Sequence, residues 1–292
     1  MPRPLSIGFK TLPQHVSYPE LLGFWQEADG LPVLGHGWLF DHLTPVENAV
    51  AIGPGRVGDC FEAWTLLTAL AARTERIRLG LMVASNTYRD PTVHAQIAAS
   101  ADAISNGRIE FGVGAGWEPY EHASRGIPLP PPAERIARLE EAVVIAKRLW
   151  TEDAVDFDGR WHRLREARLG PKPVQQPHPP VTIGGGGEQL MLRVVARHAD
   201  RWNFVGGDAD TFRHKVAVLR RHCEAVGRDP EEIELSVQAR VNLDDVPGSI
   251  RGAQALVDAG ATHVVLVLQR PYRPGLATWL AEEVAPRIRP AG

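Results

Sequence analysis

The sequence predicts a (β/α)8 barrel, in which eight parallel strands close into a cylinder inside a ring of helices. Three observations support this prediction. Short runs of β-forming residues alternate with helical runs from one end of the chain to the other. The run at 79–84 is almost entirely apolar, which is typical of a parallel strand buried on both faces. Glycine or small polar clusters follow the strand ends, which a doubly wound open sheet, the alternative, explains less well.

Each predicted strand is a short run of β-branched, aromatic or aliphatic residues that ends in a polar or glycine-rich turn. The strands are expected at residues 5–11, 38–40, 79–84, 108–113, 181–183, 202–205, 233–241 and 263–268. Eight strands joined by helices fit a closed parallel barrel with right-handed crossovers. At 292 residues the chain has the usual length of such a barrel, so we expect one domain over 1–292.

The predicted helices lie between these strands, at residues 18–29, 60–76, 91–105, 133–150, 189–198, 211–226, 249–259 and 276–288. Their apolar residues recur with the spacing of an amphipathic helix. Pro91 is well suited to a first helical turn, and the pair Asn106-Gly107 ends the same helix.

Two segments interrupt the alternation. The segment 116–132 contains four prolines, so we expect an ordered lid or wall rather than a plain helix. The segment 151–180 is an insertion after the fourth helix of the barrel. Asp158-Gly159 lies there between β-forming residues and predicts a hairpin, followed by a proline-rich return.

Composition excludes several classes of function. The net charge is −3 and no block of Lys or Arg occurs, so we expect no nucleic-acid or membrane partner. No stretch reaches the about 18 apolar residues of a membrane span, and we expect a cytoplasmic protein. Cys60 and Cys223 lack a CxxC partner and are interpreted as reduced thiols. The histidines show no metal-ligand spacing, so no metal is expected.

Functional groups of such barrels gather where the strands end, which selects candidate residues. Asp41 and His42 follow the second strand, where a histidine positions a substrate or transfers a proton; a local capping role is the alternative. Ala84, Ser85 and Asn86 follow the third strand. These small side chains let a planar ring approach the backbone, although an exposed turn explains them equally well.

Two glycine-rich turns complete the list of candidates. The first is a weak motif that does not match the dinucleotide fingerprint, and consists of Gly114, Ala115 and Gly116. The second precedes a helix, where consecutive backbone N–H groups form a natural phosphate site, with a flexible turn as the alternative; it consists of Gly184, Gly185, Gly186 and Gly187. The sequence therefore indicates a phosphate-bearing cofactor that carries the chemistry.

An ordered set of motifs resembles the luciferase-like flavin oxidoreductase superfamily over about residues 5–270. These motifs lie at 79–83, 88–91, 105–117, 180–187 and 198–203. Within the superfamily the chain looks most like the branch that uses the deazaflavin coenzyme F-420, which exchanges hydride with an organic substrate. The resemblance also implies a homodimer and a bulge after the third strand that often contains a non-prolyl cis peptide.

The resemblance assigns roles to the candidate residues. It implies that Asp41 and His42 lie near the reacting face of the ring. It implies that the ring is backed by Ala84, Ser85 and Asn86, and that Gly114, Ala115 and Gly116 line its edge. The cofactor phosphate is then held by Gly184, Gly185, Gly186 and Gly187.

Two positions depart from the sugar-phosphate dehydrogenases of this branch, which carry Trp and Glu there. Here the residues are Val46 and Trp117, which argues against glucose 6-phosphate as the substrate. Together with Arg56, they are expected to line the substrate pocket, although an exposed solubilising role is the alternative for Arg56. Two other functions stay open: an FMN-dependent monooxygenase that receives reduced flavin from a partner reductase, and a non-catalytic flavin-binding relative.

Overall fold

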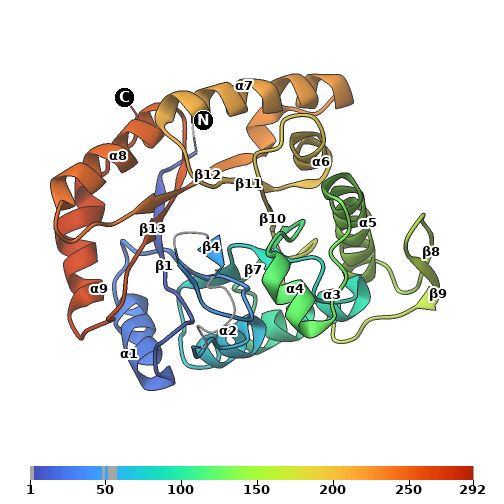
Figure 1. Cartoon of the computed structure of the whole chain (residues 1–292), viewed down its shortest axis with the longest axis horizontal. Coiled ribbons are helices and arrows are strands. Elements are labelled where there is room, and N and C mark those ends of the chain that lie inside the picture. The colour runs from blue at the N-terminus through green and yellow to red at the C-terminus, as the bar shows by residue number, and fades with distance from the viewer. Residues whose placement is uncertain (1–2, 48–49, 52–57, 292) are drawn as a thin grey trace.

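Eight parallel strands close into a barrel in the computed structural model, which describes residues 3–47, 50–51 and 58–291 (Figure 1). The order is β10-β11-β12-β13-β1-β2-β5-β7, and β7 pairs back onto β10. The strands are β1 Ser6–Lys10, β2 His36–Leu39, β5 Arg78–Leu81, β7 Ile109–Gly114, β10 Val181–Gly184, β11 Arg201–Phe204, β12 Glu234–Arg240 and β13 His263–Val267. The predicted barrel is confirmed, with each strand within a few residues of its expected place.

Helices surround the barrel (Figure 1). They are α1 Tyr18–Asp29, α2 Ala63–Ala71, α3 Pro91–Ile104, α5 Pro132–Thr151, α6 Met191–His198, α7 Ala209–Val226, α8 Val246–Asp258 and α9 Leu276–Trp279. The prediction of one helix over 276–288 is wrong, because the chain continues as a π-helix, Leu280–Val284, and a 3-10 turn, Ala285–Arg287. Pro286 lacks the N–H that a regular α-helix needs there. Helix α2 is also shorter than expected, since Glu62 caps its start.

Alternation along the strands separates an outer from an inner face of the barrel. Outward side chains such as Phe9 and Leu39 join the large core beneath the helices. Inward, Trp38, Met82 and Val265 form a separate apolar cluster. This cluster packs inside the barrel, below the carboxyl ends of the strands.

The insertion contains the predicted hairpin. Strands β8 Val155–Asp158 and β9 Arg163–Ala167 pair antiparallel, and the turn closes through a hydrogen bond from the Gly159 N–H to the His162 carbonyl. The hairpin projects from the side of the barrel beyond α5 (Figure 1). It therefore lies away from the carboxyl ends of the strands.

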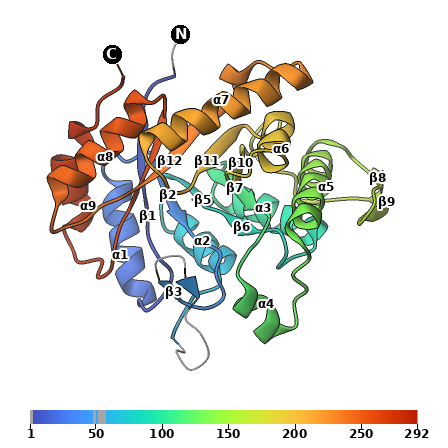
Figure 2. The ribbon, with the colours of Figure 1, turned by 45° about the horizontal axis from the view of Figure 1, so that its top comes forward.

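The loops at the carboxyl end of the barrel contain the remaining elements. Strands β3 Val46–Glu47 and β4 Val50–Ala51 and helix α4 Pro119–Arg125 lie at one end, and the chain termini lie at the other (Figure 2). Helix α4 corrects the expectation that 116–132 holds no plain helix. Strand β6 Ala84–Ser85 follows a non-prolyl cis peptide between Met82 and Val83, so the bulge implied by the resemblance is present.

Candidate active site

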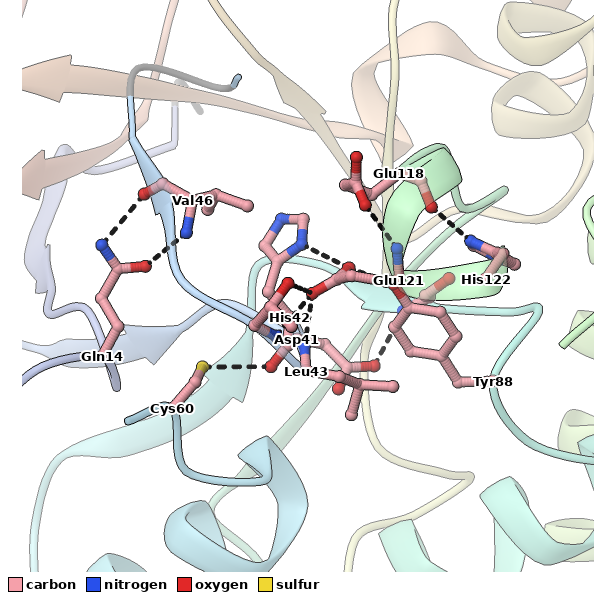
Figure 3. Close-up of polar contacts among 12 residues, drawn as sticks. Gln14, Asp41, His42, Leu43, Val46, Cys60, Tyr88, Glu118, Glu121 and His122 are labelled. Atoms are coloured by element: carbon pink, nitrogen blue, oxygen red, sulfur yellow. Dashed lines mark hydrogen bonds and ion pairs between the residues drawn. The ribbon is translucent and has the colours of Figure 1, made fainter. Parts of the chain in front are cut away.

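His42 and Glu121 form a side-chain pair at the carboxyl end of β2 (Figure 3). The His42 Nδ1 atom lies 2.9 Å from Glu121 Oε2, and the two side chains are 14% and 0% exposed. Glu121 comes from α4, which carries it across the barrel mouth to the loop after β2. The pair therefore joins two loops that are far apart in the sequence and leaves the histidine ring partly accessible.

The Glu121 carboxylate is saturated with donors. Besides His42, it accepts hydrogen bonds from the backbone N–H groups of Leu43 (2.6 Å) and Thr44 (2.8 Å), and from the hydroxyls of Thr44 and Tyr88. Burial raises the pKa of Glu121, but the hydrogen bonds from His42, Tyr88 and Thr44 outweigh it and lower the pKa to about 2. Glu121 is therefore an ionised acceptor, and Nδ1 of His42 must be the donor.

Asp41 is engaged in a different set of contacts. Its buried carboxylate accepts two hydrogen bonds from the Arg89 guanidinium, at 2.6 and 2.9 Å, and one from the Ser85 N–H at 2.9 Å. Arg89 also pairs with Glu62, the cap of α2. Asp41 thereby ties β2 to the bulge after β5, and its oxygens face these partners rather than the barrel mouth.

The segment after the cis peptide forms a platform at the barrel mouth. The Val83 side chain lies against Gly114 and Gly184, where an added Cβ would come within 2.7 and 2.9 Å of it. Asn86 N–H bonds to the Gly114 carbonyl at 3.0 Å. Gly116 has φ 78°, and a Cβ there would lie 2.6 Å from Ser85 Oγ. The glycines therefore allow the bulge to approach β7 and β10 closely.

A hydrogen-bond chain fastens this platform to α4. Ser85 Oγ lies 2.8 Å from Thr87 Oγ1, which lies 2.7 Å from His122 Nε2. His122 Nδ1 donates to the Glu118 carbonyl at the start of the helix. The platform and the Glu121 carboxylate consequently belong to one connected unit.

The run from Gly184 to Gly187 leads into α6. Among the described residues, no side chain caps this helix, whose N-cap is Leu190. An added Cβ at Gly186 would meet nothing within 4 Å, so the run borders open space. The Gly185 N–H donates to the Asn203 carbonyl at 3.3 Å, so Gly186 and Gly187 are the part of the run that a phosphate could approach.

Of the three predicted pocket residues, two lie near His42. The Trp117 ring is 46% exposed and meets the His42 ring edge to face, with centroids 5.5 Å apart. Val46 is held through its backbone by the Gln14 amide, at 2.8 and 2.9 Å. Arg56 lies outside the described residues.

Sequence reasoning missed two further residues at the barrel mouth. Lys10 ends β1 and donates from Nζ to the Met82 carbonyl and to Gln238 Oε1, both at 3.0 Å. Burial, followed by the charge of Arg240, lowers the pKa of Lys10 to about 8. Cys60 donates to the His42 carbonyl at 3.3 Å.

Cys60 does not provide a nucleophile. Burial, together with the nearby Glu121 and Asp41 carboxylates, raises the pKa of its thiol to about 12. The reactive thiolate is then scarce at neutral pH.

Within the described ranges, no group of three His, Cys, Asp or Glu side chains is placed to hold a metal. In the same part of the chain, no helix is long and apolar enough to cross a membrane.

The sequence is similar to a known protein family and to several known proteins. Residues 37–264 match the model of the luciferase-like monooxygenase family. An F-420-dependent glucose-6-phosphate dehydrogenase of Kineococcus radiotolerans is 30% identical over 259 residues, which cover 87% of this chain and 71% of the relative. An uncharacterised protein of Mycobacterium tuberculosis is 33% identical over 196 residues, 66% of this chain and 68% of that protein.

A solved structure agrees in fold. The coenzyme F-420-dependent tetrahydromethanopterin reductase of Methanopyrus kandleri superimposes with a TM-score of 0.80 at 16% sequence identity. The match covers 98% of this chain and 100% of the reductase. At this identity the likeness extends to the fold alone.

Proposed function

The chain belongs to the luciferase-like monooxygenase family, and from this premise we propose that it is an oxidoreductase that transfers a hydride between the deazaflavin coenzyme F-420 and a small organic substrate. The observation that carries the proposal is the His42–Glu121 pair beside the glycine-backed platform. The relative of 30% identity that is named for F-420 dependence supports the choice of cofactor.

The residues at the barrel mouth fit such a cofactor. The platform of Ala84, Ser85 and Asn86 would back a planar ring, and Gly114, Ala115 and Gly116 would border its edge. The open run from Gly184 to Gly187 would hold a phosphate at the start of α6. When bound, the deazaflavin supplies the carbon that gives up or receives the hydride.

His42 accepts or donates the proton that is transferred together with the hydride. Since Glu121 holds the Nδ1 proton, Nε2 is the nitrogen left for a substrate. Neutral His42 accepts a proton from an alcohol through Nε2, and protonated His42 returns it to a carbonyl oxygen. Glu121 fixes the orientation and the tautomer of the ring through this hydrogen bond, as a carboxylate does beside a catalytic histidine.

Asp41 acts as a positioning residue in this proposal. Its carboxylate holds the Ser85 N–H and Arg89, so it sets the place of the platform relative to His42. A contact between Asp41 and the reacting atoms is not needed, because His42 alone supplies the proton site.

The substrate is an alcohol or carbonyl compound with an apolar body. Polar groups around His42 in the described part of the chain already have partners within the protein: the Gln14 amide binds the Val46 backbone, and Glu121 is saturated. Phe40 and Trp117 flank the His42 ring at 4.9 and 5.5 Å. This wall suits an apolar group better than the hydroxyls of a sugar phosphate.

The cofactor assignment is tested by titrating the protein with oxidised coenzyme F-420 and following the quenching of its fluorescence. We expect saturable binding in the micromolar range, which Gly186→Val weakens at least about tenfold by filling the phosphate turn. Gly252→Val is the matched control, because an added Cβ there also meets nothing within 4 Å. No binding by the wild type at tens of micromolar coenzyme would falsify the assignment.

The family also contains monooxygenases, so an FMN-dependent reaction is the second candidate. It predicts that reduced FMN binds more tightly than the deazaflavin and that substrate turnover consumes oxygen. An oxygen electrode and a competition titration separate the two. A binding-only relative would bind the deazaflavin but catalyse no substrate-dependent change in its spectrum.

A further inference from the structure

Lys10 places a cation at the mouth of the barrel. Its neighbour Phe9 packs outward into the core, so the alternation of the strand directs Lys10 inward. Lys10 is paired in register with Trp38 of β2 and Val267 of β13, near the carboxyl ends of both strands. Both Lys10 and Gln238 keep some accessible surface, so neither is closed off completely from solvent.

Neutral groups alone bind the Lys10 ammonium in the part of the chain that the structure describes. Nζ donates to the Met82 carbonyl and to Gln238 Oε1. The Gln238 amide cannot turn, because its Nε2 donates to Asn203 Oδ1 at 2.8 Å, and Asn203 Nδ2 donates in turn to Ser236 Oγ at 2.9 Å. The charged neighbour that acts on Lys10 is Arg240, a second cation.

Two deeply buried arginines of this chain have carboxylate partners, while the half-buried Arg108 uses all five of its donors on neutral oxygens within the protein. Arg89 pairs with Asp41 and Glu62, and Arg201 pairs with Glu110 and Glu234. Lys147, which is also largely buried, lies 3.9 Å from Asp200. A buried charge without an opposite charge is costly to a fold. The position of Lys10 is therefore explained best if its counter-charge arrives with a ligand.

We propose that Lys10 and Gln238 form an anion subsite at the mouth of the barrel, which receives an anionic oxygen or nitrogen of a bound ligand. An ammonium has three donors, and two of the Lys10 donors are used inside the protein. The third is open to the ligand. The anion belongs either to the ionised edge of the deazaflavin ring or to a carboxylate of the substrate, and the first source rests on the proposed function.

The experiment compares wild type with Lys10→Met, Gln238→Glu and the control Lys147→Met. Gln238→Glu places a carboxylate against Lys10 and so competes with the ligand anion. The first probe is oxidised coenzyme F-420, titrated by fluorescence quenching. The second is benzoate, with benzamide as its uncharged counterpart, added to each protein while its melting temperature is measured.

The two probes distinguish the sources of the anion. If the ring is the source, Lys10→Met and Gln238→Glu each weaken F-420 binding at least about tenfold, the usual loss for a charged hydrogen bond. Lys147→Met then binds F-420 as the wild type does. If a substrate carboxylate is the source, F-420 affinity is unchanged, and benzoate, unlike benzamide, raises the melting temperature of the wild type more than that of Lys10→Met.

A purely structural lysine gives other results. It predicts that Lys10→Met lowers the melting temperature of the ligand-free protein, whereas an unpaired charge predicts no loss, and a rise for Gln238→Glu. The proposal is overturned if wild type and both variants respond alike to both probes. If the wild type fails to bind F-420, the cofactor assignment fails, and the benzoate comparison alone decides the subsite. Gln238→Glu serves if Lys10→Met does not fold.

Discussion

The two ends of the barrel treat buried charge differently. At the amino ends of the strands, Glu110 binds both Arg78 and Arg201, and Arg201 also binds Glu234, so the charges balance. At the carboxyl ends, Lys10 is held by neutral groups, and His42 offers Nε2 to the mouth of the barrel. Arg89 is also paired at the carboxyl ends, with Asp41 and Glu62, so the difference is that Lys10 and His42 each keep an open position, which we propose serves a ligand.

Two buried histidines, the first residues of β2 and β13, lie at the amino ends of these strands. His36 stacks on His263 with ring centroids 3.9 Å apart. Burial, followed by the charge of Arg201, lowers the pKa of His36 to about 3, and the same causes lower the pKa of His263. Both rings are therefore neutral and add no charge to the barrel interior.

The largest effect on activity is expected from a substitution of His42, at the carboxyl ends of the strands. His42→Ala removes the proton acceptor and should lower kcat/KM by about 10²–10⁴-fold. Affinity for coenzyme F-420 should change little, since the His42 ring is not part of the platform, whereas the melting temperature should fall, because the buried Glu121 carboxylate loses one of its donors. His214→Ala, at an exposed histidine of α7, is the control. Equal activity of the two variants would exclude His42 from the reaction.

The paired charges at the amino ends of the strands should contribute to the free energy of unfolding. Glu110→Gln leaves Arg201 buried beside an uncharged amide, and we expect a loss of about 3–5 kcal/mol in the free energy of unfolding, measured in urea. Asp210→Asn breaks an exposed ion pair on α7, in which the side chain of Arg213 is 52% and that of Asp210 is 90% exposed. This substitution should lower the free energy of unfolding by less than about 1 kcal/mol. Similar losses for both would show that burial does not decide how much such a pair contributes to stability.

Glu121 should make the free energy of unfolding depend on pH in the acid range. Its pKa is lowered from 4.5 to about 2 in the fold, so the unfolded state binds more protons between these values. The contribution to stability is complete above pH 4.5 and is lost as the pH falls towards 2. We expect this loss to be about 2–3 kcal/mol in the wild type and absent in Glu121→Gln. Parallel acid-unfolding curves would contradict it.

Lys10 should respond in the opposite range. Its pKa is lowered from 10.5 to about 8, so between these values the unfolded chain keeps a proton that the folded chain has lost. The free energy of unfolding of the wild type should therefore rise relative to Lys10→Met above pH 8, by up to about 1.4 kcal/mol per pH unit. A difference that stays constant from pH 7 to 10 would show that Lys10 does not titrate there.

Much of the fold follows from local patterns. The apolar run at 79–84 predicts a buried strand, and Asp158-Gly159 predicts a turn, because each depends only on neighbouring residues in the sequence. Helix α4 is missed since prolines and Gly126 surround a segment of one to two turns. The last helix is misjudged because the chain changes to a π-helix after Trp279 and to a 3-10 turn at Pro286, which lacks a backbone donor.

The site is less accessible to such reasoning. His42 is found because it follows a strand, but its partner Glu121 is 79 residues away, and no pattern in the sequence assigns it a role. Lys10 reads as a polar residue at a strand end, and only the closed barrel reveals that it is buried against Met82 and Gln238. Pairing across the barrel is a property of the closed sheet, which the sequence pattern does not specify residue by residue.

A single-turnover measurement without oxygen shows whether the protein passes a hydride from the deazaflavin to a carbonyl compound. The protein is loaded with reduced coenzyme F-420 and mixed with small apolar ketones, and the absorbance of the oxidised deazaflavin is followed. We predict that this absorbance returns when a suitable ketone is present and that His42→Ala slows the return at least about a hundredfold. Oxidation that requires oxygen instead of a ketone, or that proceeds equally fast in His42→Ala, would contradict the account.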